Sequence, residues 1–173
     1  LDNGYFIKKS DKDYKSFVLP TFQELYNGER FKKSVITATE DNELHDVRKM
    51  PDLFYKANLA YLEILMSKEI WIDERYPELK EIYELRHDIF RMNLPQMFNS
   101  LGGTYRQKIS LLEKGTEGTQ YLVDQFLFDT KQGQHGYRYV NFGVTYAESD
   151  FTDAEGAMRY EGEELKFMQD IMN

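Results

Sequence analysis

Two aspartates, Asp11 and Asp13, stand two residues apart, and residues 14–20 after them have the composition of a β-strand. Side chains two positions apart on a strand leave the same face, with Cα atoms roughly 6.5–7 Å apart. Such a pair can hold Mg²⁺, which takes oxygen ligands and keeps positions free for water and substrate phosphates. The Ser-Asp-Lys-Asp stretch is also typical of a solvated turn. The pair alone therefore leaves a metal site and a turn as alternatives.

A second set of polar residues follows the same alternation. Asp41, Glu43 and His45 are spaced so that all three can share one face of a strand. Because Mg²⁺ prefers oxygen ligands, His45 is expected to be structural or to support a ligand, although it could itself bind a metal. Asp46 directly precedes a helical segment, and its role as the N-cap of that helix is a sufficient explanation.

A basic stripe is predicted in the C-terminal half. Lys131, His135 and Arg138 stand at i, i+4 and i+7, which places them on one helix face. Such a face could contact a triphosphate or the backbone of an RNA-like acceptor. The alternative is a solvated face, or structural pairing with nearby acids such as Asp124 and Asp129.

The elements that must position these groups form a strand-rich first third and a helical remainder. Strands are predicted at 14–20, 34–39 and 41–45, with a short helical turn at 21–26. Helical spacing of apolar residues begins at Val47 and is interrupted at Asn58, which is interpreted as the left-handed residue that ends a helix.

Further along the chain, apolar spacing predicts a helix from Pro77 up to Pro95 and others at 96–114, 130–148 and 162–172. Gly102-Gly103 is expected to mark a close crossing of two helices. The apolar run 70–72 is either a strand or an anchor between two lobes.

Composition restricts the function classes. The chain has 173 residues, enough for one substantial core or two small lobes, and its 41% hydrophobic content argues against global disorder. A net charge of −8 disfavours strong binding to duplex DNA. The absence of cysteine excludes disulfides, thiolate catalysis and Cys-ligated metals. No apolar run is long enough to span a membrane and no signal peptide opens the chain, so a cytoplasmic protein with no membrane partner is predicted.

Several separate blocks, taken in order, resemble the predicted nucleotidyltransferases of the DNA polymerase beta-like superfamily. The blocks are residues 10–15 (SDKDYK), 19–21 (LPT), 41–49 (DNELHDVRK), 56–58 (KAN), 62–65 (LEIL), 128–138 (FDTKQGQHGYR) and 163–165 (EEL). Together they span most of the chain, which makes the resemblance far more specific than the acid pair alone.

The resemblance implies an α+β fold, in which a small mixed β-sheet nucleotidyltransferase lobe at residues 1–73 precedes a helical C-terminal lobe at residues 74–173. In that family, two carboxylates on one strand and a third on its neighbour hold divalent metal. By position these are Asp11, Asp13 and Asp41, with Glu43 as the alternative third ligand. The expected cofactor is Mg²⁺, with Mn²⁺ as an alternative.

The resemblance also bears on nucleotide binding. The residues that it assigns to this role are Ser10, Lys15, Asn58, Lys131, His135 and Arg138. Family members carry a Gly-Ser motif upstream of the acid pair, on a turn that holds the nucleotide phosphates, and none precedes Asp11 here. Because the sequence starts at Leu1 rather than Met, we expect it to lack an upstream segment. If the molecule itself lacks that segment, nucleotide binding should be weak.

The expected reaction is the transfer of a nucleoside monophosphate from a nucleoside triphosphate to an acceptor hydroxyl. A protein, an RNA end and a small molecule are all compatible with this chemistry as acceptor. One alternative is a metal-dependent phosphodiesterase, because two-metal carboxylate clusters also serve hydrolysis. The other is a catalytically inactive nucleotide- or protein-binding module, which the missing Gly-Ser motif favours.

Overall fold

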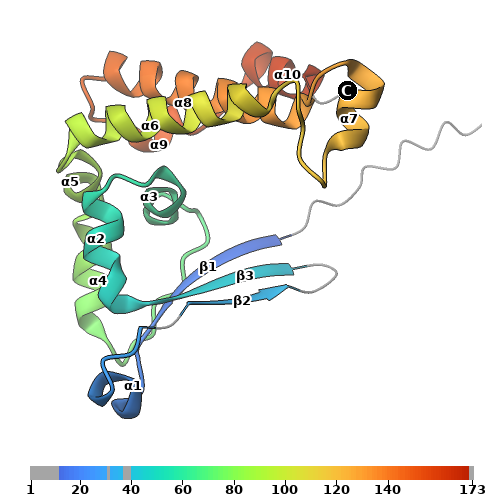
Figure 1. Cartoon of the computed structure of the whole chain (residues 1–173). Coiled ribbons are helices and arrows are strands. Elements are labelled where there is room, and N and C mark those ends of the chain that lie inside the picture. Colours follow the sequence, from blue (N-terminus) through green and yellow to red (C-terminus); the bar gives the residue numbers. More distant parts are fainter. Residues whose placement is uncertain (1–11, 31, 37–39, 172–173) are drawn as a thin grey trace, which may run out of the picture. The chain divides into compact units, whose positions relative to one another are not determined.

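The structure is a computed structural model that describes residues 12–30, 32–36 and 40–171 (Figure 1). The chain divides into two compact units, Leu1–Leu53 and Phe54–Asn173. The strands found in the described residues all belong to the first unit, and the regular structure of the second is helical. The α+β class is therefore confirmed, and the boundary between the units lies earlier in the chain than the predicted 73/74.

The sheet of the first unit has three strands, β1 (Lys12–Val18), β2 (Lys32–Ile36) and β3 (Glu40–Asp46), in the order β1-β3-β2. The central strand, β3, is parallel to β1 and antiparallel to β2. The three predicted strands are thus confirmed. Both β1 and β2 begin two residues before the predicted start.

Helix α1 (Phe22–Tyr26) is short because local signals define both of its ends. Thr21 and Glu24 form a capping box, in which the Glu24 amide donates to Thr21 Oγ1 at 3.3 Å and the Thr21 amide donates to Glu24 Oε2 at 2.7 Å. Gly28, just beyond the helix, has a φ of 69°, which glycine adopts without steric cost. The predicted helical turn is confirmed.

After β3 the chain forms a 3₁₀ turn, η1 (Val47–Lys49), and then helix α2 (Met50–Tyr55). Asp46 is the N-cap of the turn, and its Oδ1 accepts from the Arg48 amide at 2.9 Å. Its predicted capping role is confirmed.

Asn58 does not end a helix; it begins one. Its φ of −72° is not left-handed, and its side-chain oxygen accepts from the Ala60 amide at 3.2 Å as the N-cap of α3 (Leu59–Leu65). The left-handed residue is Ala57, with a φ of 47°. The prediction was wrong because asparagine suits both a left-handed stop and an N-cap, and here the cap is formed.

The region from Pro77 to Pro95, predicted as one helix, contains two helices before α6 begins. They are α4 (Pro77–Glu84) and α5 (Arg86–Arg91), and Leu85 separates them with a φ of −82° and a ψ of 7°. Residues 70–72 are not a strand, and Trp71 is 85% exposed.

The remaining helices are α6 (Leu94–Leu111), α7 (Gln120–Phe126), α8 (Thr130–Glu148), α9 (Ala154–Ala157) and α10 (Gly162–Asp170). The bounds of α8 match the prediction, and those of α6 and α10 differ from it by a few residues. The two short helices α7 and α9 were not predicted.

Helices α6 and α8 lie side by side and antiparallel (Figure 1). Glycines of α8 allow the close approach: a Cβ at Gly133 would lie 3.4 Å from Leu112 Cδ1, and one at Gly143 would lie 3.3 Å from Leu101 Cδ1. By contrast, a Cβ at Gly103 would meet no atom within 4 Å, and one at Gly102 would meet only Arg106 of its own helix. The expectation that Gly102-Gly103 forms the crossing is therefore wrong.

An aromatic cluster joins α5 to α8 in the core of the second unit. Phe90 is 1% exposed, and Phe142 and Tyr146 are each 2% exposed. The Phe90 ring lies edge-on to Phe142 at 6.0 Å and to Tyr146 at 5.7 Å, an arrangement that aromatic quadrupoles favour. This cluster fixes α8, the helix that carries the basic stripe.

Candidate functional site

The register of the sheet brings the two acidic segments together. Asp13 on β1 is directly paired with Asp41 on β3, and Lys15 is paired with Glu43. Since paired positions of neighbouring strands lie on one face of a sheet, these four positions share a face. The side chains of Asp13 and Asp41 lie outside the described residues, as do Ser10 and Asp11 entirely. The metal-ligand assignment therefore stays a prediction. Of its residues, Asp13 and Asp41 have a described backbone position but no described side chain.

Glu43 and His45 contact each other on the same face of β3. His45 Nε2 lies 3.2 Å from Glu43 Oε1, and the Glu43 side chain is 23% exposed. His45 itself is only 3% exposed, and its ring lies 6.1 Å from the Phe17 ring on β1. This arrangement allows His45 to hold the Glu43 carboxylate in place, as expected for a residue that supports a ligand.

Lys15 lies next to these groups on β1. It is half-buried and directly paired with Glu43 across the parallel strands. Opposite charges at paired positions attract each other, so Lys15 can offset part of the negative charge of this face.

Asp46 belongs to the other face of β3 and has a structural role. Its Oδ1 accepts from Arg48 Nε at 2.9 Å and its Oδ2 from Arg48 Nη2 at 2.6 Å, and the residue is fully buried. The Arg48 hydrogen bond is the main reason that the pKa of Asp46 is lowered to about 2. Arg48 Nη2 also donates to the backbone carbonyl of Glu29. Asp46 is thus already neutralised by a cation and is a poor candidate for a metal ligand.

The basic stripe belongs to the second unit. Lys131 is exposed, and His135 and Arg138 are half-buried. Arg138 Nη2 bonds to Glu63 Oε1 of α3 and does not pair with Asp124 or Asp129. Arg138 therefore does pair with an acid, as the alternative interpretation expected, but the acid is Glu63 and not Asp124 or Asp129. Sequence could not identify Glu63, because it precedes Arg138 by 75 residues and no local pattern connects them.

His135 is surrounded by positive charge. Burial, followed by the charges of Lys108, Arg138 and Lys131, lowers the pKa of His135 to about 4. Its ring is therefore neutral at pH 7 and can accept or donate a hydrogen bond but adds no charge. Lys108 on α6, which sequence reasoning missed, completes this positive region.

Asn58, the remaining nucleotide-binding candidate, uses its side-chain oxygen to cap α3. It belongs to the second unit with Lys131, His135 and Arg138, whereas Lys15, Asp13, Asp41 and Glu43 belong to the first. The expectation that both sets contact the same nucleotide stays a prediction.

Among the side chains that the structure describes, no group of three or more histidine, aspartate or glutamate residues could hold a metal ion. The side chains of Asp11, Asp13 and Asp41 are outside that set. Within the described helices, none combines the length and apolarity needed to cross a bilayer.

Comparisons with known proteins do not assign the chain to a family. No protein-family model matches the chain, and no significant match exists among curated proteins or solved structures.

Proposed function

We propose that the protein is a nucleotidyltransferase, which transfers a nucleoside monophosphate from a nucleoside triphosphate to an acceptor hydroxyl. The main support is the pairing of Asp13 with Asp41 on neighbouring parallel strands. The resemblance described above supplies the reaction class, and it requires carboxylates from two adjacent strands on one face of a sheet. The fold alone would not supply the chemistry.

Asp11, Asp13 and Asp41 are the residues that would hold Mg²⁺, or Mn²⁺ in its place, and Glu43 is the alternative third ligand. Carboxylate oxygens are the donors that Mg²⁺ prefers, so the donor set fits the ion. When bound, the metal supplies positive charge that offsets the triphosphate and lowers the pKa of the attacking hydroxyl.

The reaction is an in-line displacement at the α-phosphorus. The acceptor oxygen forms a bond to phosphorus, the bond to the bridging oxygen of pyrophosphate breaks, and the acceptor proton passes to Asp41 or Glu43. His45, at 3.2 Å from Glu43, orients that carboxylate. Lys15 adds positive charge beside the site for the phosphates.

The stripe on α8 would contribute unequally to phosphate binding. Arg138 is engaged by Glu63, and His135 is neutral at pH 7 because its pKa is about 4. Within the described residues Lys131 has no ion-pair partner. Lys131 is therefore the member of the stripe whose charge is most available to a triphosphate.

The proposal is tested by incubating the protein with α-labelled and γ-labelled nucleoside triphosphates and Mg²⁺. We expect the α-label to enter an acceptor and the γ-label to leave as pyrophosphate. Asp13→Asn should lower this transfer by about a hundredfold or more, since the substitution removes one of the carboxylates that would hold the metal ion. Chelation of the metal should abolish it.

Glu74→Gln is the matched control, because Glu74 is an exposed acid of the second unit. It should leave transfer unchanged, and circular dichroism should show that both variants are folded. Comparing Asp41→Asn with Glu43→Gln identifies the third carboxylate. Hydrolysis without transfer would indicate a phosphodiesterase instead. Triphosphate binding without turnover, measured by calorimetry, would indicate an inactive binding module.

A further inference from the structure

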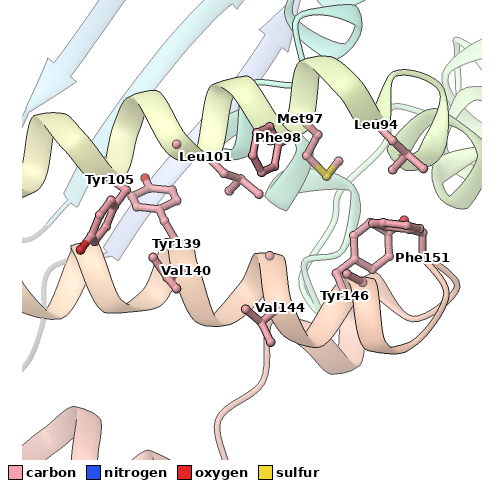
Figure 2. A pocket seen from close by; sticks show the side chains of 13 residues that line it. Leu94, Met97, Phe98, Leu101, Tyr105, Tyr139, Val140, Val144, Tyr146 and Phe151 are labelled. Atoms are coloured by element: carbon pink, nitrogen blue, oxygen red, sulfur yellow. The ribbon is translucent and has the colours of Figure 1, made fainter.

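An apolar groove lies between α6 and α8 in the second unit (Figure 2). Its volume is about 410 Å³, within the range of small-molecule sites. The groove follows α6 from Leu94 to Tyr105, a distance of about 16 Å at a rise of 1.5 Å per residue. All the residues that line this site belong to the second unit, and it has no part in the proposed transfer reaction.

The walls of the groove expose apolar side chains to water. Phe98 of α6 is 79% exposed, and Val140 and Val144 of α8 are 45% and 52% exposed. Val140 and Val144 are one turn apart on α8, and all three residues line the same groove, so their exposure is concentrated in one place. A ligand lying between the helices would remove this surface from water.

The two ends of the groove differ in chemistry. Leu94, Met97, Phe151 and Tyr146 lie at one end, and Tyr105 and Tyr139 lie at the other (Figure 2). Within the described residues, neither the Tyr105 nor the Tyr139 hydroxyl has a hydrogen-bond partner. Burial raises the pKa of Tyr139, which keeps its hydroxyl protonated and able to donate.

A cation lies beside the polar end. Arg106 Nε donates to the Gly102 carbonyl at 3.1 Å, and a Cβ at Gly102, which lines the groove, would lie 3.5 Å from Arg106 Nη2. The backbone thus holds the guanidinium at the edge of the groove. In the part of the chain that is described, Arg106 has no carboxylate partner. An unpaired guanidinium is suited to a carboxylate, which it can bind through two parallel hydrogen bonds.

We propose that the α6–α8 groove binds an aliphatic carboxylate, with its apolar chain along Phe98, Val140 and Val144 and its head group at Arg106. The hydroxyls of Tyr105 and Tyr139 lie at the same end and donate to the carboxylate. The guanidinium of Arg106 at one end of a mainly apolar groove favours this ligand over a wholly apolar molecule.

Decanoate is the test ligand, titrated into the 173-residue chain by calorimetry. We expect binding to a single site. Arg106→Gln should weaken it by about threefold, the usual scale of an exposed ion pair, and Arg106→Lys should weaken it less. Val144→Asp, at a half-exposed position, should abolish binding, and Phe98→Ala should weaken it without affecting the fold.

Lys114→Gln is the matched control, because Lys114 is an exposed cation beyond the C-terminal end of α6, outside the groove. It should leave decanoate affinity unchanged. Equal affinity for decanol and decanoate, or equal effects of Arg106→Gln and Lys114→Gln, would overturn the role of Arg106. Absence of decanoate binding would overturn the proposal. A concentration-dependent dimer in ultracentrifugation would also overturn it, if Val144→Asp dissociates the dimer and decanoate does not, because a second copy of the chain would then cover the groove. Each result is independent of nucleotidyl transfer, so this proposal and the proposed reaction fail separately.

Discussion

Two carboxylates of β3 have different environments because side chains along a strand alternate between the two faces of the sheet. Asp46 is fully buried and held by Arg48, and its pKa is about 2. Glu43 lies on the opposite face, where its side chain is 23% exposed and contacts His45. The charge of Asp46 is committed to the fold, whereas Glu43 is accessible enough to receive an ion or a proton.

His135 gives a pH prediction. Its pKa in the folded protein is about 4, below the ordinary value of 6.5. As the pH falls below about 6.5, the unfolded chain therefore binds a proton that the folded chain does not, and the free energy of unfolding decreases between pH 6.5 and 4. His135→Gln should remove this part of the pH dependence of Tm, with His87→Gln as the control at an exposed position. An NMR titration that gave a pKa near 6.5 for His135 would contradict the expectation.

At the scale of elements, the start of α8 depends on one buried carboxylate. Asp129 Oδ1 accepts from the Gln132 amide at 3.1 Å, and its Oδ2 accepts from the Thr119 hydroxyl. The Asp129 amide donates to the Leu112 carbonyl at 2.7 Å. A single residue therefore connects the end of α6, the start of α7 and the start of α8.

Asp129→Ala should lower the free energy of unfolding by about 2 kcal/mol, because it removes the N-cap and leaves the buried Thr119 hydroxyl without an acceptor. Urea unfolding measures this change. Asp129→Asn keeps an oxygen at the cap and should cost about half as much. An unchanged urea midpoint for the alanine variant would show that α8 does not need the cap.

Elements with strong local signals were predicted from the sequence, and others were not, for physical reasons. The starts of α1 and α8 have local signals, because the capping side chains of Thr21 and Asp129 each bond an amide only three residues further along the chain. Helices α7 and α9 are too short to show a clear apolar period. The break at Leu85 has no glycine or proline to mark it, so no local signal predicts it.

At the scale of the whole molecule, the candidate site was partly predictable. Alternation along each strand placed Asp41, Glu43 and His45 on one face of β3, and the observed register is consistent with that. The direct pairing of Asp13 with Asp41 could not be read from the sequence, because register depends on contacts between distant segments. For the same reason, the Arg138 partner, Glu63, was missed.

The net charge of −8 gives a prediction for the entire chain. Binding to duplex DNA relies on cations that neutralise phosphates, so we expect a Kd weaker than about 10⁻⁴ M at physiological salt. Fluorescence anisotropy of a labelled duplex measures this affinity. Binding tighter than about 10⁻⁶ M with a steep dependence on salt would contradict the expectation.

Arg48 ties Asp46, the last residue of β3, to the Glu29 carbonyl in the segment before β2. A slip of β3 by one residue along β2 would move the positions of Asp41 and Glu43 to the opposite side of the sheet. The tether resists that slip from the far end of the strand. A guanidinium with no place in the proposed chemistry thereby acts as a lock on alignment, keeping the acidic positions opposite their partners on β2.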